Sequence, residues 1–189
     1  MDNSAGHDRP GTLYGVGVGP GDPGMVTLRA VEVIKSVSTV AYPVARPGAE
    51  SRALEVVRRH FNGSQKLLPL TMPMTRDRES LKEARAEALA AITSAAADGD
   101  VAYLSLGDPL FYSTFGYMAK DYTGSIEVIC GVTSLGAMSA ATGLPLADGD
   151  IATVVVSGAS HEALRKALEM GSSIVIIKPR ALKEESLDL

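Results

Sequence analysis

Short apolar runs that alternate with amphipathic stretches are the feature that most constrains the fold of this chain. The runs lie at 13–18, 39–42, 66–70, 101–106, 125–129, 153–157 and 173–177. Several stretches between them carry apolar residues at helical spacing, as Leu81, Ala84, Ala88 and Ile92 do. Strands that alternate with helices are typical of an α/β fold with a largely parallel sheet.

Local signals mark the ends of some of these elements. Thr27 is a candidate N-cap, and Leu28, Val31 and Ile34 follow it at helical spacing, which predicts a helix there. Pro43 follows the strand predicted at 39–42, and we expect it to stop that strand.

The segment 144–150 contains Pro, Gly and two acidic residues, a composition typical of a linker. We therefore predict an N-terminal α/β domain at 11–145, a partial C-terminal α/β domain at 146–189, and a flexible tail at 1–10. The second domain holds one βαβ unit in about forty residues, a size at which a lone module needs outside support.

Composition narrows the classes of function. The chain has 189 residues, a formal charge of −4 and 46% hydrophobic residues, so it can bury a core but lacks the basic face that nucleic-acid binding needs. Cys130 is the single cysteine, which excludes an internal disulfide. No apolar run is long enough to span a bilayer, and we expect a cytoplasmic protein that binds neither nucleic acid nor membrane.

Three glycine-containing loops follow predicted strands, at 15–24, 107–113 and 131–134. In parallel sheets, ligands bind at the carboxyl ends of strands, where loops lead into helices. The three loops are therefore the candidate binding site of the chain.

The first loop contains Gly19, Gly21 and Gly24 in the spacing of a dinucleotide-binding fingerprint. We do not favour that function, because Pro20 and Pro23 each remove a backbone donor that a phosphate cradle would need. No acidic residue at 42–46 is available to hold a ribose. A purely structural turn remains the alternative for this loop.

Single residues in the other two loops permit two interpretations each. Asp108 can accept hydrogen bonds from a ligand, but Asp-Pro after a strand is also ordinary turn chemistry. Thr133 or Ser134 is a good helix N-cap, and the same hydroxyl groups could contact a ligand.

Taken together, the three loops are more specific. The run 15–24 followed by 27–30 resembles the opening motif of the tetrapyrrole methylases, and 107–113 and 131–134 resemble the second and third motifs of that family. The resemblance implies an α/β tetrapyrrole methylase fold, in which two α/β domains hold the cofactor between them, here with a shortened second domain. This chain departs from the family pattern at Cys130, where proline is usual, and in stopping at Leu189, before the family's later strands.

Within the family, three stretches resemble the subgroup that methylates precorrin-2 at C(20) to give precorrin-3A in cobalamin (vitamin B12) biosynthesis. They are Tyr42-Pro43 with Ser51, the segment 72–75, and the extended motif 104–114. The alternatives are a cobalt-factor II C(20)-methyltransferase, a diphthine synthase, and a truncated S-adenosylmethionine-binding member without turnover. The segment 72–75 argues against diphthine synthase.

The resemblance also implies a cofactor and its contacts. S-adenosyl-L-methionine would be the methyl donor, no metal would be required, and the family typically forms homodimers. The positions that match cofactor contacts of the family are Pro20, Leu106, Gly107, Asp108, Phe111, Thr133, Ser134 and Lys178. The substrate, precorrin-2 or a related polycarboxylate, needs basic partners, for which the candidates are Arg46, Arg52, Arg76 and Arg78. His7, His60 and His161 are more typical of structural residues, and the sequence identifies no catalytic base.

Overall fold

The computed structural model describes residues 10–75, 77–157, 161–170 and 173–178. The chain divides into two compact units, residues 1–134 and 135–189, and each is described by itself. The division falls at the start of a helix, ahead of the segment 144–150 in which the sequence suggested a linker.

The first unit is built on a five-stranded sheet in which every pair of neighbours is parallel. The strand order is β3-β2-β4-β1-β5, so the central strand β4 lies between β2 and β1. The strands are β1 (Leu13–Gly17), β2 (Thr39–Val44), β3 (Lys66–Thr71), β4 (Val101–Ser105) and β5 (Ile126–Ile129). The prediction of an α/β fold with a parallel sheet is confirmed.

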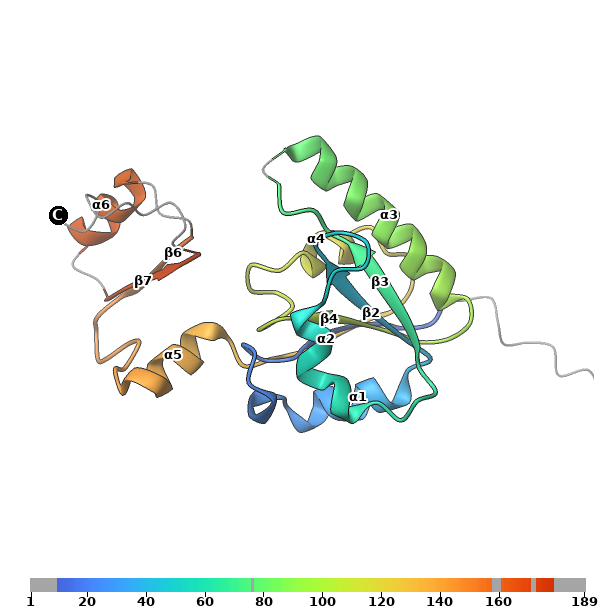
Figure 1. Ribbon diagram of the computed structural model, residues 1–189. Coiled ribbons are helices and arrows are strands. Elements are labelled where there is room, and N and C mark those ends of the chain that lie inside the picture. The colour runs from blue at the N-terminus through green and yellow to red at the C-terminus, as the bar shows by residue number, and fades with distance from the viewer. Residues whose placement is uncertain (1–9, 76, 158–160, 171–172, 179–189) are drawn as a thin grey trace, which may run out of the picture. The chain divides into compact units, whose positions relative to one another are not determined.

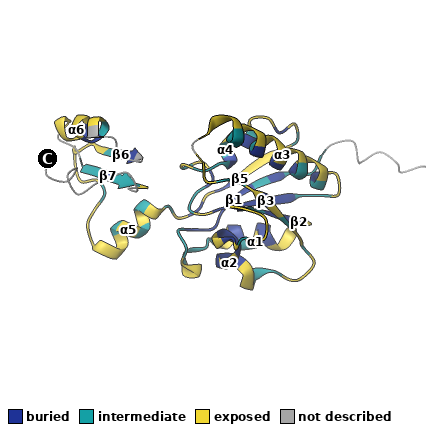
Figure 2. Cartoon of the chain, turned by 45° about the horizontal axis from the view of Figure 1, so that its top comes forward, coloured by how far each residue is buried: buried dark blue, intermediate teal, exposed yellow. Residues whose placement is uncertain are grey.

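Helices cover both faces of this sheet (Figures 1 and 2). On one face, Val16, Ala102 and Leu104 pack against α1 and α2, and on the other, Leu13 and Tyr103 pack against α3 and α4. Every residue of β4 is buried, as expected for a central strand covered on both sides. The helices are α1 (Leu28–Ser36), α2 (Arg52–Val57), α3 (Arg78–Ala96) and α4 (Phe115–Ala119), with single 3-10 turns η1 (Pro23–Met25) and η2 (Arg58–His60).

The helix predicted after Thr27 is confirmed as α1, and so is its N-cap. Thr27 accepts a hydrogen bond from the amide of Ala30, as an N-cap should. The residues that α1 buries are Ala30, Val33 and Ile34, whereas Leu28 is 84% exposed. Leu28 opens the first turn of α1, and helical spacing alone did not identify which residues this helix buries.

The prediction that Pro43 stops the second strand is also wrong, because β2 continues to Val44. Beyond Ala41 the strand pairs only with β3, since its register with β4 covers Thr39 to Ala41. The hydrogen bonding between β2 and β4 has therefore ended before Pro43. The missing amide hydrogen of Pro43 costs no hydrogen bond on that side of the strand.

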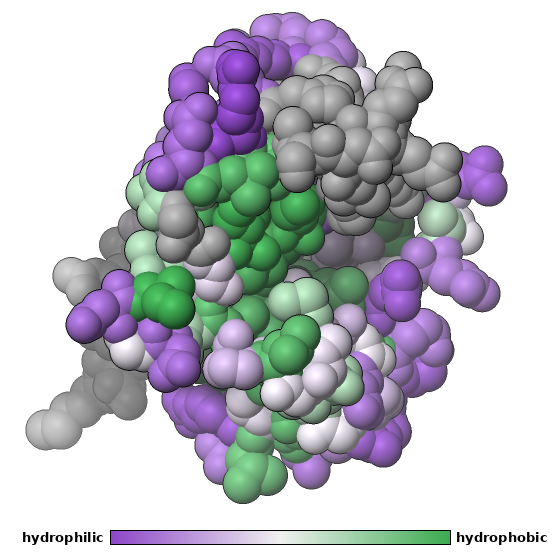
Figure 3. Space-filling view, turned by 90° about the vertical axis from the view of Figure 1, so that its left-hand side faces the viewer, coloured by the Kyte–Doolittle hydropathy of each residue, from purple (hydrophilic) through white to green (hydrophobic). Residues whose placement is uncertain are grey.

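The second unit contains α5 (Ser134–Thr142), β6 (Thr153–Ser157), α6 (His161–Glu169) and β7 (Ser173–Ile177). β6 and β7 form a parallel pair, which confirms the predicted βαβ unit. Val156 and Ala167 form the centre of a small cluster between the strand pair and α6. Figure 3 shows an apolar patch bordered by polar residues on the face that it presents. Among the described residues, no helix is long and apolar enough to cross a membrane.

Gly15, in the middle of β1, leaves room for the ring of Phe115. A Cβ at Gly15 would lie 2.4 Å from two ring carbons of Phe115, which is fully buried. The same ring lies 5.9 Å from that of Tyr103, whose hydroxyl bonds to Thr114 at 2.8 Å. Burial raises the pKa of Tyr103 to about 12.

Replacing Gly15 with Ala should therefore destabilise the first unit. We expect Gly15→Ala to lower the free energy of unfolding in urea by about 1–3 kcal/mol, because the buried ring of Phe115 must move. Combining it with Phe115→Leu should cost less than the sum of the two single changes. Gly116→Ala is the control, since its Cβ would meet only Leu110, at 4.0 Å. Equal stabilities for Gly15→Ala and the parent protein would contradict this packing.

Candidate functional site

The three predicted loops meet at one edge of the sheet. They leave the carboxyl ends of β1, β4 and β5, which are neighbours in the order β4-β1-β5. This is the edge at which parallel sheets place their ligand sites.

Three glycines allow the backbones of these loops to touch. A Cβ at Gly131 would lie 2.1 Å from the carbonyl oxygen of Gly107, and a Cβ at Gly17 would lie 2.5 Å from the amide nitrogen of Gly131. No side chain fits at either position. We call this contact of Gly17, Gly107 and Gly131 the glycine junction.

Backbone hydrogen bonds hold the first loop against the second. The amide of Gly107 donates to the carbonyl of Gly19 at 2.7 Å, and the amide of Gly19 donates to the carbonyl of Gly107 at 3.3 Å. Both glycines have positive φ, +80° at Gly19 and +77° at Gly107, which other residues rarely adopt.

Asp108 holds the second loop against the third. One carboxylate oxygen accepts the amide of Leu110 at 2.8 Å, and the other accepts the amide of Gly131 at 3.1 Å. Hydrogen bonds to a charged group typically stabilise a fold by about 1.5–3 kcal/mol each. The sequence did not reveal this role, because nothing along the chain links Asp108 to a residue in a different loop.

The rest of the second loop is fastened to its own strand and to α4. The hydroxyls of Ser105 and Ser113 are 2.9 Å apart, and Ser113 accepts the amide of Phe115 at 3.2 Å. Phe111 and Tyr112 precede Ser113 in this loop, and their rings meet edge to face with their centroids 4.9 Å apart. Tyr112 has a φ of +50°, a conformation that tends to persist at functional positions.

The outer surface of the junction is apolar with an open centre. Leu106 is 41% exposed and Val132 is 36% exposed, so both aliphatic side chains are open to a ligand. A Cβ at Gly107 would meet no atom within 4 Å, so a ligand can approach the backbone there. The surface therefore suits an organic ligand with both apolar and hydrogen-bonding groups.

The loops bring most of the predicted site residues to this edge. Phe111 is half-buried, Thr133 is half-buried, and Ser134 is exposed at the start of α5. The residues in or directly before the three loops are Pro20, Leu106, Gly107, Asp108, Phe111, Thr133 and Ser134. Lys178 follows β7 in the second unit and has a φ of +54°. Its contact with the cofactor stays a prediction.

The first loop uses its amides internally. The amide of Gly24 donates to the Asp22 side chain at 2.7 Å, and that of Met25 donates to the Asp22 carbonyl at 2.9 Å. With the Gly19 amide also bonded, these three donors are not aimed at a phosphate. This agrees with the argument against a dinucleotide fingerprint.

The basic and histidine candidates are dispersed. Arg46, Arg52 and Arg78 are exposed, while Arg76 and His7 lie outside the described residues, as does the side chain of His161. Burial and the charge of Arg59 lower the pKa of His60, which lies in η2. Within the described part of the chain, His, Cys, Asp and Glu side chains form no cluster that could hold a metal ion.

With this geometry in place, comparison with known proteins identifies the family. The model of the tetrapyrrole (corrin/porphyrin) methylases matches residues 12–189, and the chain belongs to that family.

Two curated relatives indicate the subgroup within this family to which the chain is similar. The chain is 35% identical over 176 residues to a protein of Methanocaldococcus jannaschii named "Probable cobalt-precorrin-2 C(20)-methyltransferase", covering 92% of this chain and 74% of the relative. It is 35% identical over 182 residues to the precorrin-2 C(20)-methyltransferase of a Sinorhizobium species, covering 89% and 73%. The chain thus spans about three quarters of the length of each relative.

A solved structure shares the fold. The uroporphyrin-III C-methyltransferase of Thermus thermophilus, complexed with S-adenosyl homocysteine, is 28% identical and superposes with a TM-score of 0.55. The match covers 79% of this chain and 57% of that structure.

Cys130 precedes Gly131 of the glycine junction, and the pKa of its thiol depends on Asp108. The hydrogen bond to the Asp108 carboxylate raises the pKa of the Cys130 thiol above its ordinary value, and burial and the negative charge of Asp108 act in the same direction. Because the thiolate is the reactive form, this exposed thiol should react slowly at neutral pH.

We therefore expect Asp108→Asn to lower the pKa of Cys130 and to speed its alkylation by iodoacetamide near pH 8. The rate in the parent protein should keep rising at pH values where the variant has levelled off. Asp98→Asn is the control, because Asp98 pairs with Lys66 at 3.3 Å, away from Cys130. Identical pH profiles for the parent and Asp108→Asn would show that Asp108 does not control this thiol.

Proposed function

We propose that this protein is an S-adenosylmethionine-dependent C-methyltransferase that methylates precorrin-2, or its cobalt complex, at C(20) in cobalamin biosynthesis. The glycine junction is the structural observation that carries the proposal. It presents the three family motifs as one surface, and the relatives that share these motifs are named for this reaction.

The residues at the junction fit S-adenosylmethionine. The exposed side chains of Leu106 and Val132 offer apolar surface for an adenine ring or a thioether chain. The open space at Gly107 admits the ligand to backbone groups. Asp108 can accept a further hydrogen bond, because a carboxylate has four acceptor sites, and the amides of Leu110 and Gly131 and the thiol of Cys130 use three of them.

We assign cofactor contacts to Pro20, Leu106, Gly107, Asp108, Phe111, Thr133, Ser134 and Lys178. When bound, S-adenosylmethionine supplies a methyl group activated by a positively charged sulfur, so the transfer requires no metal. The contribution of the chain is then to hold and align the two reactants, which can supply much of the rate. A rigid junction suits that task, because its loops are fixed by backbone contacts.

The stretches that resemble the C(20)-methylating subgroup lie on the other half of the same edge. Tyr42 and Pro43 are near the end of β2, the segment 72–75 follows β3, and the extended motif follows β4. Since the order begins β3-β2-β4, these stretches are neighbours. We infer that this half receives the tetrapyrrole and that the β4-β1-β5 half receives the methyl donor.

A homodimer is part of the proposal. In the second unit, α6 packs against the face of the β6-β7 pair that carries Val156 and Ile176, and Val155 and Ile177 on the other face are half-buried. In the first unit, Ile126 and Val128 of the edge strand β5 are 39% and 38% exposed. Apolar edges and faces of this kind favour pairing with another chain.

Light scattering at low micromolar concentration tests the assembly. We expect the mass of two chains, independent of S-adenosylmethionine. The mass of one chain across that range would contradict the dimer without bearing on the methyl transfer itself.

The activity is tested by incubating the protein with methyl-labelled S-adenosylmethionine and either precorrin-2 or cobalt-precorrin-2. We expect one labelled methyl group at C(20). Asp108→Ala should weaken S-adenosylmethionine binding in calorimetry by roughly tenfold or more, because a charged acceptor is lost and the Gly131 amide is left unpaired. Asp98→Ala should bind normally.

Three results would contradict the proposal. Binding of S-adenosylmethionine without methylation of either substrate would favour a member of the family without turnover. Methylation of a protein histidine would favour diphthine synthase. Unchanged affinity in Asp108→Ala would remove that residue from the cofactor site.

A further inference from the structure

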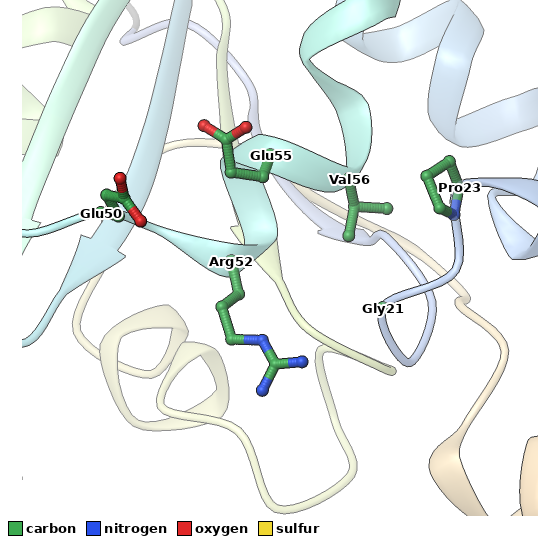
Figure 4. Close-up of a pocket in the computed structure, with 6 residues that line it drawn as sticks. All are labelled: Gly21, Pro23, Glu50, Arg52, Glu55 and Val56. Carbon is green, nitrogen blue, oxygen red and sulfur yellow. The ribbon is translucent and has the colours of Figure 1, made fainter.

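A pocket of about 210 Å³ lies between the first glycine loop and the start of α2 (Figure 4). Gly21 and Pro23 form its wall on the loop side. The α2 side is lined by Glu50, Arg52, Glu55 and Val56.

Arg52 supplies the positive charge of this pocket. Figure 4 shows its guanidinium directed toward Gly21 and away from Glu55. A Cβ at Gly21 would lie 4.0 Å from Nη2 of Arg52, so the guanidinium lies close beside the glycine. Within the described residues Arg52 makes no ion pair, in contrast to Arg29 and Arg58.

The two acidic residues of the lining do not neutralise Arg52. Glu55 holds Arg58 through two hydrogen bonds, of 3.0 and 2.6 Å, so its charge is already balanced. Glu50 makes no ion pair with Arg52. The pocket thus contains a guanidinium whose donors are available to a ligand, and carboxylate is the group that a guanidinium binds best.

The first loop connects this pocket to the glycine junction. Gly21 and Pro23 line the pocket, while Gly19, two residues earlier, is bonded to Gly107. The pocket therefore lies where the β1 loop faces the β2-to-α2 connection, between the two halves of the edge. Neither Arg46 nor Arg78 lines it.

We propose that Arg52 binds one acidic side chain of the tetrapyrrole and so orients the ring toward the glycine junction. This rests on the proposed function, and it selects Arg52 from the four arginines that the sequence offered. Arg52 is a substrate-positioning residue in this account, and it does not contact the reacting carbon.

Equilibrium titrations with precorrin-2 and with cobalt-precorrin-2, followed by absorbance, test the assignment. We expect Arg52→Gln to weaken binding by about tenfold to a hundredfold, the usual effect of losing a charged hydrogen-bond partner. The affinity of Arg52→Lys for the substrate should lie between those of the parent protein and Arg52→Gln. The ammonium of Lys keeps the charge but cannot make the paired hydrogen bonds of a guanidinium. Affinity for S-adenosylmethionine, measured by calorimetry, should not change.

Two further variants make the result specific. Lys66→Gln removes the same charge at the amino end of β3, where Lys66 pairs with Asp98, and should bind normally. Glu50→Gln removes a negative charge from the lining and should strengthen binding of the substrate by about two- to fivefold.

The outcomes separate the inference from the proposed function. If the parent protein binds neither precorrin-2 nor cobalt-precorrin-2, the proposed function fails. If the parent binds one of them and Arg52→Gln binds it equally well, the assignment of Arg52 is overturned while the function stands. A loss of S-adenosylmethionine affinity as large as the loss for the tetrapyrrole would also overturn it, since Arg52 would then act on the loop as a whole.

Discussion

The close contact of three backbones at Gly17, Gly107 and Gly131 is the constraint on which the rest of the site depends. A Cβ at Gly131 would lie 2.1 Å from the carbonyl oxygen of Gly107, so these loops can meet only where no side chain intervenes. The Asp108 carboxylate then fixes the third loop by accepting the amide of Gly131. Three loops from distant parts of the chain become one rigid surface that a methyl donor can use without reorganisation.

Much of the fold could be predicted from the sequence, because the strands are short, apolar and bounded by glycine or proline. The strands β6 and β7 have the predicted bounds. Predictions failed where tertiary context decides. The helical spacing of Leu28, Val31 and Ile34 did not identify the residues that α1 buries, and the passage of β2 through Pro43 depends on which neighbour is still paired. Asp108 was selected as a ligand contact, but its bond to Gly131 arises only when β5 lies beside β1.

The carboxyl edge of the sheet divides into two neighbouring halves. The family motifs follow β4, β1 and β5, and the stretches typical of the C(20)-methylating subgroup are associated with β3, β2 and β4. β4 is common to both halves, and all of its residues are buried. The pocket with Arg52 lies beside the first glycine loop, where a large polycarboxylate could be held against the methyl donor.

The central claim is that the three loops form one binding surface for S-adenosylmethionine, and amide chemical shifts test it most directly. In a two-dimensional NMR titration, the account predicts that the amides of Gly19, Gly107 and Gly131 shift together and follow one dissociation constant. The amide of Lys66, at the amino end of β3, should not move. Shifts confined to one loop, or different dissociation constants for the three glycines, would contradict it.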